Sequence, residues 1–389
     1  MTGSTATSLG HALGLYLHWP YCARICPYCD FNVYRPKGDD DALLDAILAD
    51  MADWRVRTGD RPLASLHLGG GTPSLMTPTA VARVLETAER LWGFTTDIEI
   101  GLEANPNDQA RFAGLAEVGV QRLSLGVQSF DDAVLRQLGR DHDGPSARSA
   151  IETALAAFGR VSVDMIYAWA GQDLAAWSRD LGEALASGAS HVSAYQLTIE
   201  AGTAFGKRSA RGETLAVDGD SAADLYEATQ ALCDAAGFPA YEISNHARTP
   251  QDRSTHNRLY WEGGDWIGVG PGAHGRLGHS AKGGRFATTA CRRPADYIRS
   301  VQESGSGLAA DGTERLTAQD DLVERAFLGL RIIEGLDLAH VTASTGCVLD
   351  AAGITQMIEA GMLEQDGLRL RLSARGRLLA DRVTREILP

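Results

Sequence analysis

Short apolar runs alternate with longer amphipathic stretches along the first two thirds of the chain. Six runs have the length of buried strands, and most are followed by a stretch whose apolar residues recur at helical spacing. Such alternation predicts a parallel sheet, either open or curled into a barrel. The predicted strands are Leu15–His18, Ser65–Leu68, Ile98–Leu102, Arg122–Val127, Val161–Ile166 and Val192–Leu197, and the predicted helices are Asp41–Arg57, Pro78–Leu91, Asp108–Val118, Asp131–Leu138, Ala175–Ser187 and Asp220–Ala236.

The alternation ends near residue 250. From about Pro250 to Gly312 the sequence is polar and rich in glycine, and we expect a long irregular segment over the sheet. From Thr317 onward, three helical stretches, a hairpin over Met362–Leu372 that turns at Asp366-Gly367, and a final helix predict a small winged-helix-like domain. The predicted division is a barrel over 1–250, a connecting segment over 251–316 and a C-terminal domain over 317–389.

Composition and charge narrow the classes of function. The chain has 44% hydrophobic and 22% charged residues, as an ordinary globular protein does. Its net charge of −14, from 36 basic and 50 acidic side chains, would repel a phosphate backbone, so we do not expect a nucleic-acid partner. DNA binding by the winged domain would rest on fold analogy alone. Neither a signal peptide nor an apolar run of about 18 residues occurs, which predicts a cytoplasmic protein.

Three of the six cysteines lie within eight positions, as Cys22, Cys26 and Cys29, in a C-x3-C-x2-C pattern after the first predicted strand. Three thiolates can hold three corners of a 4Fe-4S cluster and leave one iron open to a chelating ligand. Zinc prefers four protein ligands, and the nearest fourth candidates, His18 and Asp30, have no familiar spacing. The pattern therefore favours a cluster over a zinc site or free thiols.

Other polar or glycine-rich motifs also follow predicted strands. They are Gly69–Pro73, Glu103–Pro106, Gln128 and Asp164. The carboxyl ends of parallel strands form the functional edge of α/β architectures. We expect these motifs to surround one site together with the cysteines.

With these motifs in place, the sequence resembles the radical-SAM superfamily. Within it, the sequence resembles the oxygen-independent coproporphyrinogen III oxidase group and, most closely, the HemW-like haem chaperones. The resemblance covers nearly the whole chain. It is carried by Tyr16–Cys22, Pro27–Phe31, Leu102–Pro106, Leu125–Phe130, Tyr195–Thr198, Tyr241–Asn245 and His256–Trp261.

The resemblance implies a fold and a set of cofactors. The fold is an incomplete (β/α)6 TIM-like barrel with a small C-terminal helical, winged-helix-like domain. A 4Fe-4S cluster on Cys22, Cys26 and Cys29 would bind S-adenosylmethionine (SAM), which the superfamily cleaves reductively. The residues at the family's SAM contacts are Tyr16, Tyr28, Gly70, Gly71, Thr72, Glu103, Gln128, Arg140 and Asp164.

One position separates the two branches of the group. The oxidases carry a further cysteine two residues after the third, where this chain has Phe31, and their N-terminal extension is longer than the 21 residues before Cys22. The resemblance thus implies haem as cargo and transfer of that haem to an acceptor protein, for which a membrane-associated respiratory enzyme is one candidate. A homodimer of this chain is one possible assembly. The alternative is a radical-SAM enzyme that acts on a porphyrinogen, or a methyltransferase. Haem contacts are expected at His256, Tyr260 and Trp261.

Two further features of the sequence bear on these expectations. The stretch Ala168-Trp169-Ala170 lacks the proline that the family commonly has there, which leaves the shape of the cofactor rim open. A basic stretch offers either a positive surface for haem propionates or a solvated loop. It has one acid, Asp296, against Arg276, Lys282, Arg285, Arg292, Arg293 and Arg299.

Overall fold

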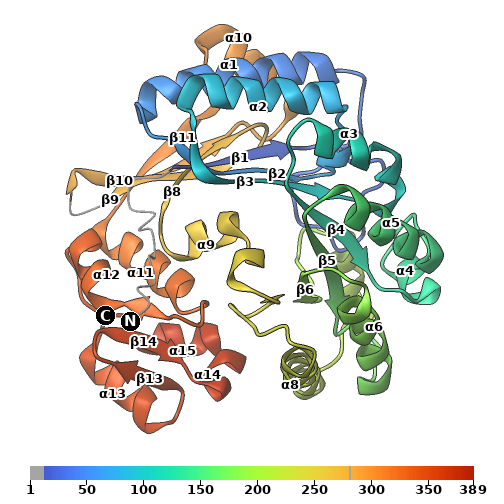
Figure 1. The fold of residues 1–389 in the computed structure, drawn as a ribbon. Helices are drawn as coiled ribbons and strands as arrows, with labels where there is room; N and C mark the ends of the chain where they lie inside the picture. The colour runs from blue at the N-terminus through green and yellow to red at the C-terminus, as the bar shows by residue number, and fades with distance from the viewer. Residues whose placement is uncertain (1–12, 280–281) are drawn as a thin grey trace.

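A curved sheet runs through most of the molecule. The computed structural model describes residues 13–279 and 282–389, and within them eleven strands pair in the order β11-β10-β9-β8-β1-β2-β3-β4-β5-β6-β7. Neighbours from β8 to β6 in this order are parallel, and the remaining pairs are antiparallel. Figure 1 shows the sheet as an arch with most helices outside it. The arch is an incomplete barrel, because its first and last strands do not meet.

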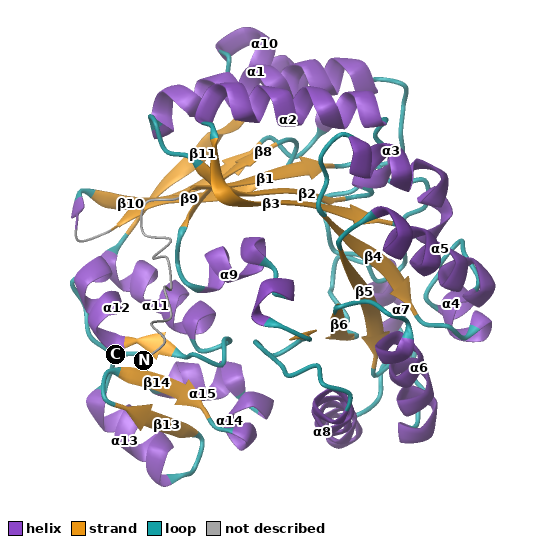
Figure 2. Ribbon diagram, viewed as in Figure 1, coloured by secondary structure: helices purple, strands orange, loops and turns teal. Residues whose placement is uncertain are grey.

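All six predicted strands are present, and each begins within four residues of its predicted start and ends within two residues of its predicted end. The helices that connect them cover the convex face of the sheet (Figure 2). The strands are β1 (Leu13–Trp19), β2 (Leu63–Gly70), β3 (Phe94–Ala104), β4 (Arg122–Gln128), β5 (Arg160–Tyr167) and β6 (His191–Gln196), and the helices are α1 (Asp40–Thr58), α2 (Pro78–Trp92), α3 (Phe112–Glu117), α4 (Asp132–Gln137), α5 (Gly144–Ala157), α6 (Leu174–Ala186), α7 (Ala204–Ser209) and α8 (Gly219–Ala235).

Each strand has one apolar face and one face that carries the chemistry. Along β4, Leu123, Leu125 and Val127 are fully buried in the core under the helices. The alternate residues Arg122, Ser124, Gly126 and Gln128 line a cavity on the concave side. Side chains of a strand point alternately to its two faces, so this alternation fixes which residues reach the cavity.

Helix α5 was not predicted. Between β4 and β5 the sequence predicts only one short helix, which corresponds to α4. The structure has a second and longer helix, α5, between these strands. Its start reads Asp143-Gly144-Pro145, which resembles a turn. In the structure Asp143 is the N-cap and its side chain accepts a hydrogen bond from the backbone N–H of Ser146, so this turn-like sequence begins a helix.

The prediction of an irregular segment between Pro250 and Gly312 was wrong. Most of it is regular and extends the sheet beyond β1. The strands were missed because glycine-rich sequence is typical of irregular structure. The glycines of this segment are needed for close strand packing, since a Cβ on Gly268 would lie 2.3 Å from the backbone oxygen of His274. The segment from 245 to 316 contains β7 (Asn245–Ala247), α9 (Thr255–Trp261), β8 (Asp265–Val269), β9 (His274–His279), β10 (Gly284–Ala290), α10 (Pro294–Ser304) and β11 (Leu308–Leu316).

The C-terminal unit has a hydrophobic core of its own. Its three helices, its hairpin and the helical end of the chain follow the predicted order, although the final helix is divided in two. Strand β12 makes the hairpin a three-stranded sheet, as in a winged helix. The elements are α11 (Ala318–Gly329), β12 (Leu336–Asp337), α12 (Leu338–Thr345), α13 (Ala351–Glu359), β13 (Leu363–Asp366), β14 (Arg369–Leu372), α14 (Ala374–Leu378) and α15 (Ala380–Glu386).

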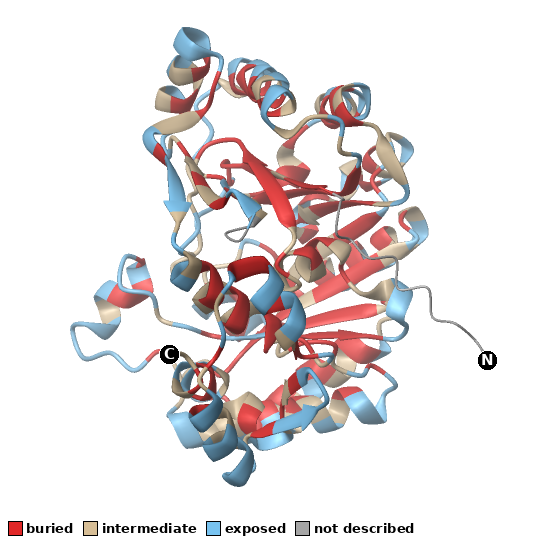
Figure 3. Ribbon diagram, turned by 90° about the vertical axis from the view of Figure 1, so that its left-hand side faces the viewer, coloured by how far each residue is buried: buried red, intermediate tan, exposed pale blue. Residues whose placement is uncertain are grey.

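A buried ion network joins this unit to the sheet. Arg285 of β10 is fully buried, and its Nε lies 3.2 Å from the Oδ1 of Asp321 on α11, which is also fully buried. Figure 3 shows the buried strands running between helices whose outer faces are exposed. Among the described residues, no helix combines the length and the apolar character needed to cross a lipid bilayer.

Candidate functional site

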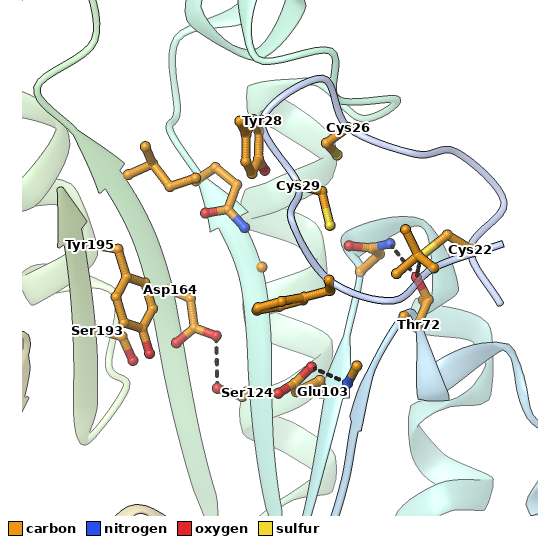
Figure 4. A pocket seen from close by; sticks show the side chains of 18 of the residues that line it. Cys22, Cys26, Tyr28, Cys29, Thr72, Glu103, Ser124, Asp164, Ser193 and Tyr195 are labelled. Atoms are coloured by element: carbon orange, nitrogen blue, oxygen red, sulfur yellow. Dashed lines mark hydrogen bonds between the residues drawn. The ribbon is translucent and has the colours of Figure 1, made fainter. Parts of the chain in front are cut away.

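A cavity of about 480 Å³ lies on the concave side of the sheet, at the carboxyl ends of the parallel strands (Figure 4). It extends from the cysteine loop after β1 down to Arg122, the first residue of β4. Eleven of the twelve residues predicted to bind the cluster and SAM line it. These are Cys22, Cys26, Tyr28, Cys29, Gly70, Gly71, Thr72, Glu103, Gln128, Arg140 and Asp164.

The cysteine loop is held by polar contacts to its sulfur atoms. The hydroxyl of Thr72 donates to the Sγ of Cys22 at 3.3 Å, and the Nη1 of Arg140 donates to the Sγ of Cys26 at 3.4 Å. The Cys29 N–H donates to the carbonyl of Cys26 and closes a tight turn. Burial raises the pKa of the Cys22 thiol and raises that of Cys29 to about 11. Metal binding would have to displace these protons, and donors to sulfur stabilise the thiolates that result.

The cysteine loop supplies three thiolates, one fewer than a closed zinc site requires. A structural zinc ion needs four converging ligands, whereas each thiolate around a cubane binds a different iron. The donor set of three cysteines therefore fits a cluster with one open iron.

The glycine loop after β2 packs against the cysteine loop through its backbone. The N–H groups of Gly71 and Thr72 each donate at 2.8 Å to the carbonyls of Trp19 and Tyr21. A Cβ on Gly71 would lie 2.7 Å from both of these oxygens. Gly70 has φ 103°, and a Cβ there would meet the ring of His18 at 2.4 Å. Glycine is required at Gly71 because backbone approaches backbone there, and at Gly70 because of its positive φ and the adjacent His18 ring.

Glu103 stands at the end of β3 with its carboxylate in the cavity. Its Oε2 accepts the Gly70 N–H at 3.1 Å, and its Oε1 lies 3.3 Å from the Nε2 of His67. Burial opposes ionisation of Glu103, yet the hydrogen bond and charge of His67 and the Gly70 N–H bring its pKa below the usual value. Glu103 is thus a buried carboxylate that can accept hydrogen bonds from a ligand.

Asp164 of β5 is the second acid of the cavity. Its carboxylate accepts hydrogen bonds from the hydroxyls of Ser124 at 2.7 Å and Ser162 at 2.9 Å. Burial raises its pKa, and the hydroxyls oppose this. Ser162 also lies 2.7 Å from the Nδ1 of His191, so a chain of hydrogen bonds leads from the cavity into the wall of the barrel.

Several polar atoms at the cavity have no partner within the described chain. They include the Oε1 of Gln128 and the Oδ1 of Asn245, both buried. Gln128 also has φ 69°, a left-handed conformation that is costly for a residue with a side chain. Buried polar groups are normally paired, so orphaned atoms around a cavity fit a polar ligand such as SAM. Arg140 differs, because its Nη2 already donates to the carbonyl of Gly126 and to Asn105.

Tyr16 is the predicted SAM contact that the structure keeps out of the lining. Its ring lies behind Gly69, where a Cβ would come within 2.9 Å of Cε2. Its hydroxyl lies 2.9 Å from the Nδ1 of His18. Burial raises its pKa, so the phenol stays protonated. Tyr16 therefore supports the glycine loop from behind in this conformation.

The predicted haem residues lie on α9, which occupies the concave side of the arch (Figure 1). The ring of His256 is buried and stacks on His67 at 4.3 Å, and its Nδ1 has no partner within the described chain. Tyr260 packs on Trp266 at 4.1 Å, and Trp261 lies near Tyr241. None of the three predicted residues lines the cavity.

The basic stretch does not form one positive surface. Arg285 is buried among Asp265, Asp321 and Glu324, and Arg276 pairs with Glu324 at 2.7 Å. Arg299 pairs with Asp296 on its own helix. The expectation of a joint propionate surface was therefore wrong for these three arginines, whose charges are already matched.

The stretch that lacks the family's proline adopts an unusual turn. Ala168 has φ 66°, and its N–H donates to the Oε1 of Gln172. With Gln128, it is one of two non-glycine residues with a positive φ among the described residues, and each follows or ends a strand at the cavity edge. The turn is held by a side chain in place of a proline ring.

The lining contains further residues that were not predicted as ligand contacts, among them five with polar side chains. They come from inward positions on neighbouring strands and from α9, and strand alternation was the signal that could have found most of them. They are His67, Arg122, Ser124, Ser193 and Asn257.

Comparison with known proteins connects this geometry to two family patterns. Residues 16–181 match the Radical SAM superfamily, and residues 316–379 match the HemN C-terminal domain. The chain is 40% identical to bovine "Radical S-adenosyl methionine domain-containing protein 1, mitochondrial" over 84% of this chain and 74% of that protein. It is 36% identical to "Heme chaperone HemW" of Mycobacterium tuberculosis, over 97% and 95% of the two chains.

A solved structure shares the fold over nearly the whole chain. It is that of the coproporphyrinogen III oxidase HemN from Escherichia coli, described as a radical SAM enzyme. The TM-score is 0.81 and the sequence identity 21%, with 98% of this chain and 91% of the other covered. At this identity the likeness establishes the arrangement of barrel and C-terminal unit.

Proposed function

Because this chain belongs to the radical-SAM superfamily and, within it, to the HemN/HemW-like family, we propose that it is a haem chaperone. It binds haem and transfers it to an acceptor protein, with a 4Fe-4S cluster and SAM as resident cofactors. The observation that supports this most directly is the 36% identity to a relative named heme chaperone, which extends over 97% of the chain. HemW relatives from two other bacteria are 31% and 36% identical.

The residues of the cavity have separate roles toward the cofactors. A bound cluster supplies an open iron and an electron to SAM. Cys22, Cys26 and Cys29 hold the cluster, and Thr72 and Arg140 donate hydrogen bonds toward its sulfur ligands. The other predicted lining residues bind SAM. Their orphaned atoms and carboxylates face the cavity, where the ligand's hydroxyl, amino and adenine groups can pair with them.

A second candidate is a SAM-dependent enzyme that acts on a porphyrinogen, or a methyltransferase. The same proposed cluster and SAM residues would serve it, and the fold resembles that of a solved coproporphyrinogen III oxidase over 98% of this chain. Phe31 argues against decarboxylation, since it stands where the oxidases have a further cysteine. Its side chain is 60% exposed at the mouth of the cavity.

The haem contacts at His256, Tyr260 and Trp261 stay a prediction that requires α9 to move. In its stacked position the imidazole of His256 is 5% exposed, which leaves no room for a porphyrin plane at either nitrogen. The same holds for the partner and the compartment. The acceptor protein, a homodimer and the cytoplasm are proposals, and the relatives include mitochondrial as well as bacterial proteins.

An anaerobic haem titration of the reconstituted protein tests the proposal. We expect the Soret absorbance to saturate at one haem per chain. His256→Ala should weaken haem binding because it removes the imidazole. His142→Ala removes a comparably buried histidine outside α9 and should leave haem binding unchanged. Iron and sulfide should be present in the parent protein and absent from a variant with all three clustered cysteines changed to alanine.

Each other result has a distinct meaning. Absence of a saturable Soret band in cluster-loaded protein would overturn the chaperone proposal. Unchanged haem affinity in His256→Ala would overturn only the role of α9. Rapid release of 5′-deoxyadenosine with a decarboxylated or methylated product under reducing conditions would favour the enzyme.

A further inference from the structure

Arg122 lies at the floor of the cavity, at the opposite end from the cysteine loop. It is the first residue of β4, and its inward position places it in line with Ser124, Gly126 and Gln128 above it. Its residue surface is only 4% exposed, although the guanidinium contributes to the lining of the cavity. A buried cation facing an open space needs an explanation, because removing a charge from water is costly.

No partner for this cation is present in the part of the chain that the structure describes. No hydrogen bond or ion pair links the Arg122 guanidinium to any described residue, and Arg122 is not among the residues with additional contacts. Its neighbour on β5, Arg160, is paired at 2.7 Å with Glu99. Arg140, the other arginine of the lining, donates to Asn105 and Gly126.

The two buried acids nearest in effect to Arg122 are engaged with other groups. Burial acts to raise the pKa of Glu99 and of Asp164, and the charge of Arg122 acts to lower both. The carboxylate of Glu99 pairs with Arg160 and accepts the N–H of His256, and that of Asp164 accepts the hydroxyls of Ser124 and Ser162. Burial lowers the pKa of His191 and of His256, and the charge of Arg122 lowers both further, so these rings are neutral. Neither acid forms a hydrogen bond or an ion pair with Arg122 within the described residues, so its guanidinium is free to pair with a ligand in the cavity.

The wall between the mouth and this charge is partly apolar. Ile25 and Phe31 lie at the cysteine loop, and Ile166 and Leu197 lie at the ends of β5 and β6. Apart from the groups proposed to bind the cluster and SAM, the lining thus offers apolar contacts and one unpaired guanidinium, which suit a ligand with an apolar body and an anionic end. A guanidinium pairs best with a planar carboxylate, to which it can donate two parallel hydrogen bonds.

We propose that Arg122 binds a carboxylate of the ligand that enters the barrel, and that this carboxylate is a propionate of haem. The identity of the ligand rests on the proposed function, whereas the carboxylate site rests on the geometry of Arg122. SAM also has a carboxylate, so the test must separate the two sources. Asn257, which lies beside His256 on α9 and lines the same cavity, is a second donor within the site.

The experiment compares haem with haem dimethyl ester, in which both propionates are blocked. Wild-type protein should bind haem about 10- to 100-fold more tightly than the ester, the range expected for one buried charge-assisted hydrogen-bonded pair. Arg122→Met should lose this preference by weakening haem binding and leaving ester binding unchanged. Arg122→Lys should keep part of it. Arg299→Met, at an exposed ion pair outside the cavity, is the matched control.

The outcomes separate the inference from the proposed function. Equal affinity of the wild type for haem and ester overturns the inference and leaves the chaperone intact. No binding of either compound overturns the proposed function. If Arg122→Met loses SAM in equilibrium dialysis and keeps its preference for haem, the carboxylate is that of SAM and the haem assignment is overturned. The wild-type comparison needs no variant, so it decides even if Arg122→Met does not fold.

Discussion

At the scale of single residues, strand alternation governs which side chains can act. The motifs at the strand ends were predictable, because a carboxylate or a glycine run after a strand is visible in the sequence. The place of Arg122 in the lining was not predictable, because Arg122 lies at the start of its strand and not at its end. The absence of Tyr16 from the lining was not predictable either, because its ring lies behind Gly69. The direction in which a side chain points and its depth in the barrel depend on strand register and on packing, and a short sequence motif specifies neither.

The tightest constraint at this scale is Gly71. We expect Gly71→Ala to weaken SAM binding at least tenfold, because the added methyl group would overlap two backbone carbonyls that cannot turn away and would force the glycine loop off the cysteine loop. Equilibrium dialysis with labelled SAM measures this. Gly182→Ala is the control, since no atom lies within 4 Å of its added Cβ in α6.

The control carries its own expectation. Gly182→Ala should leave SAM binding unchanged and raise the free energy of unfolding by up to about 1 kcal/mol, because alanine favours a helix interior. Undiminished SAM affinity in Gly71→Ala would contradict the assignment of the glycine loop.

At the scale of helices and strands, composition misled most where glycine serves packing. The β8 to β11 region looked irregular because it is rich in glycine, yet Gly268 and Gly275 are there to let strands approach. Helix α5 was hidden by a Gly-Pro start that in fact follows a capping aspartate. By contrast, β1 to β6 were predictable, because a buried parallel strand needs a short apolar run and little else.

Asp50 ties three of these elements together. Its carboxylate, on α1, accepts the hydroxyl of Tyr297 on α10 at 2.6 Å and the N–H of Gly307 before β11 at 2.8 Å. Burial raises its pKa from 3.8 to about 6. Because the native state holds this proton more tightly than the unfolded chain, the stability it contributes is complete below pH 3.8 and is lost as the pH rises through about 6.

Asp50→Asn removes this titration. Urea unfolding across that pH window should therefore show the wild type losing stability relative to Asp50→Asn as the pH rises, and the difference should level off above the folded pKa. Asp45→Asn replaces an exposed carboxylate on the same helix and serves as the reference. A constant difference between the wild type and Asp50→Asn at all these pH values would show that Asp50 has no raised pKa.

At the scale of the whole molecule, a buried ion network joins the C-terminal unit to the sheet. Arg285 of β10 and Arg325 of α11 both contact Asp321, and both donate to the carbonyl of Gly263, just after α9. The sequence indicated two units but not this joint, since charges that meet across 36 residues leave no local pattern. The network sets the position of α9 as well as that of the C-terminal unit.

Arg285→Met should lower the free energy of unfolding by about 3 kcal/mol, because it removes a positive charge that balances the buried carboxylate of Asp321. We expect a lower urea midpoint and faster proteolysis between β11 and α11. Arg299→Met, at an exposed pair, should change the free energy of unfolding by less than about 1 kcal/mol. Equal midpoints for the two variants would mean that the network does not hold the units together.

The arch that stops at the three-residue strand β7 has a consequence for how a large flat molecule could reach the interior. On that side the enclosure is completed by α9 and by ion pairs such as Arg331 with Glu242 and Arg253 with Glu334, not by further strands. A partly exposed pair such as Arg253 with Glu334 parts and re-forms at far smaller cost than a ladder of backbone hydrogen bonds. For the tetrapyrrole proposed above, this flank is the part of the enclosure that could open while the strands that carry the proposed cofactor residues stay paired.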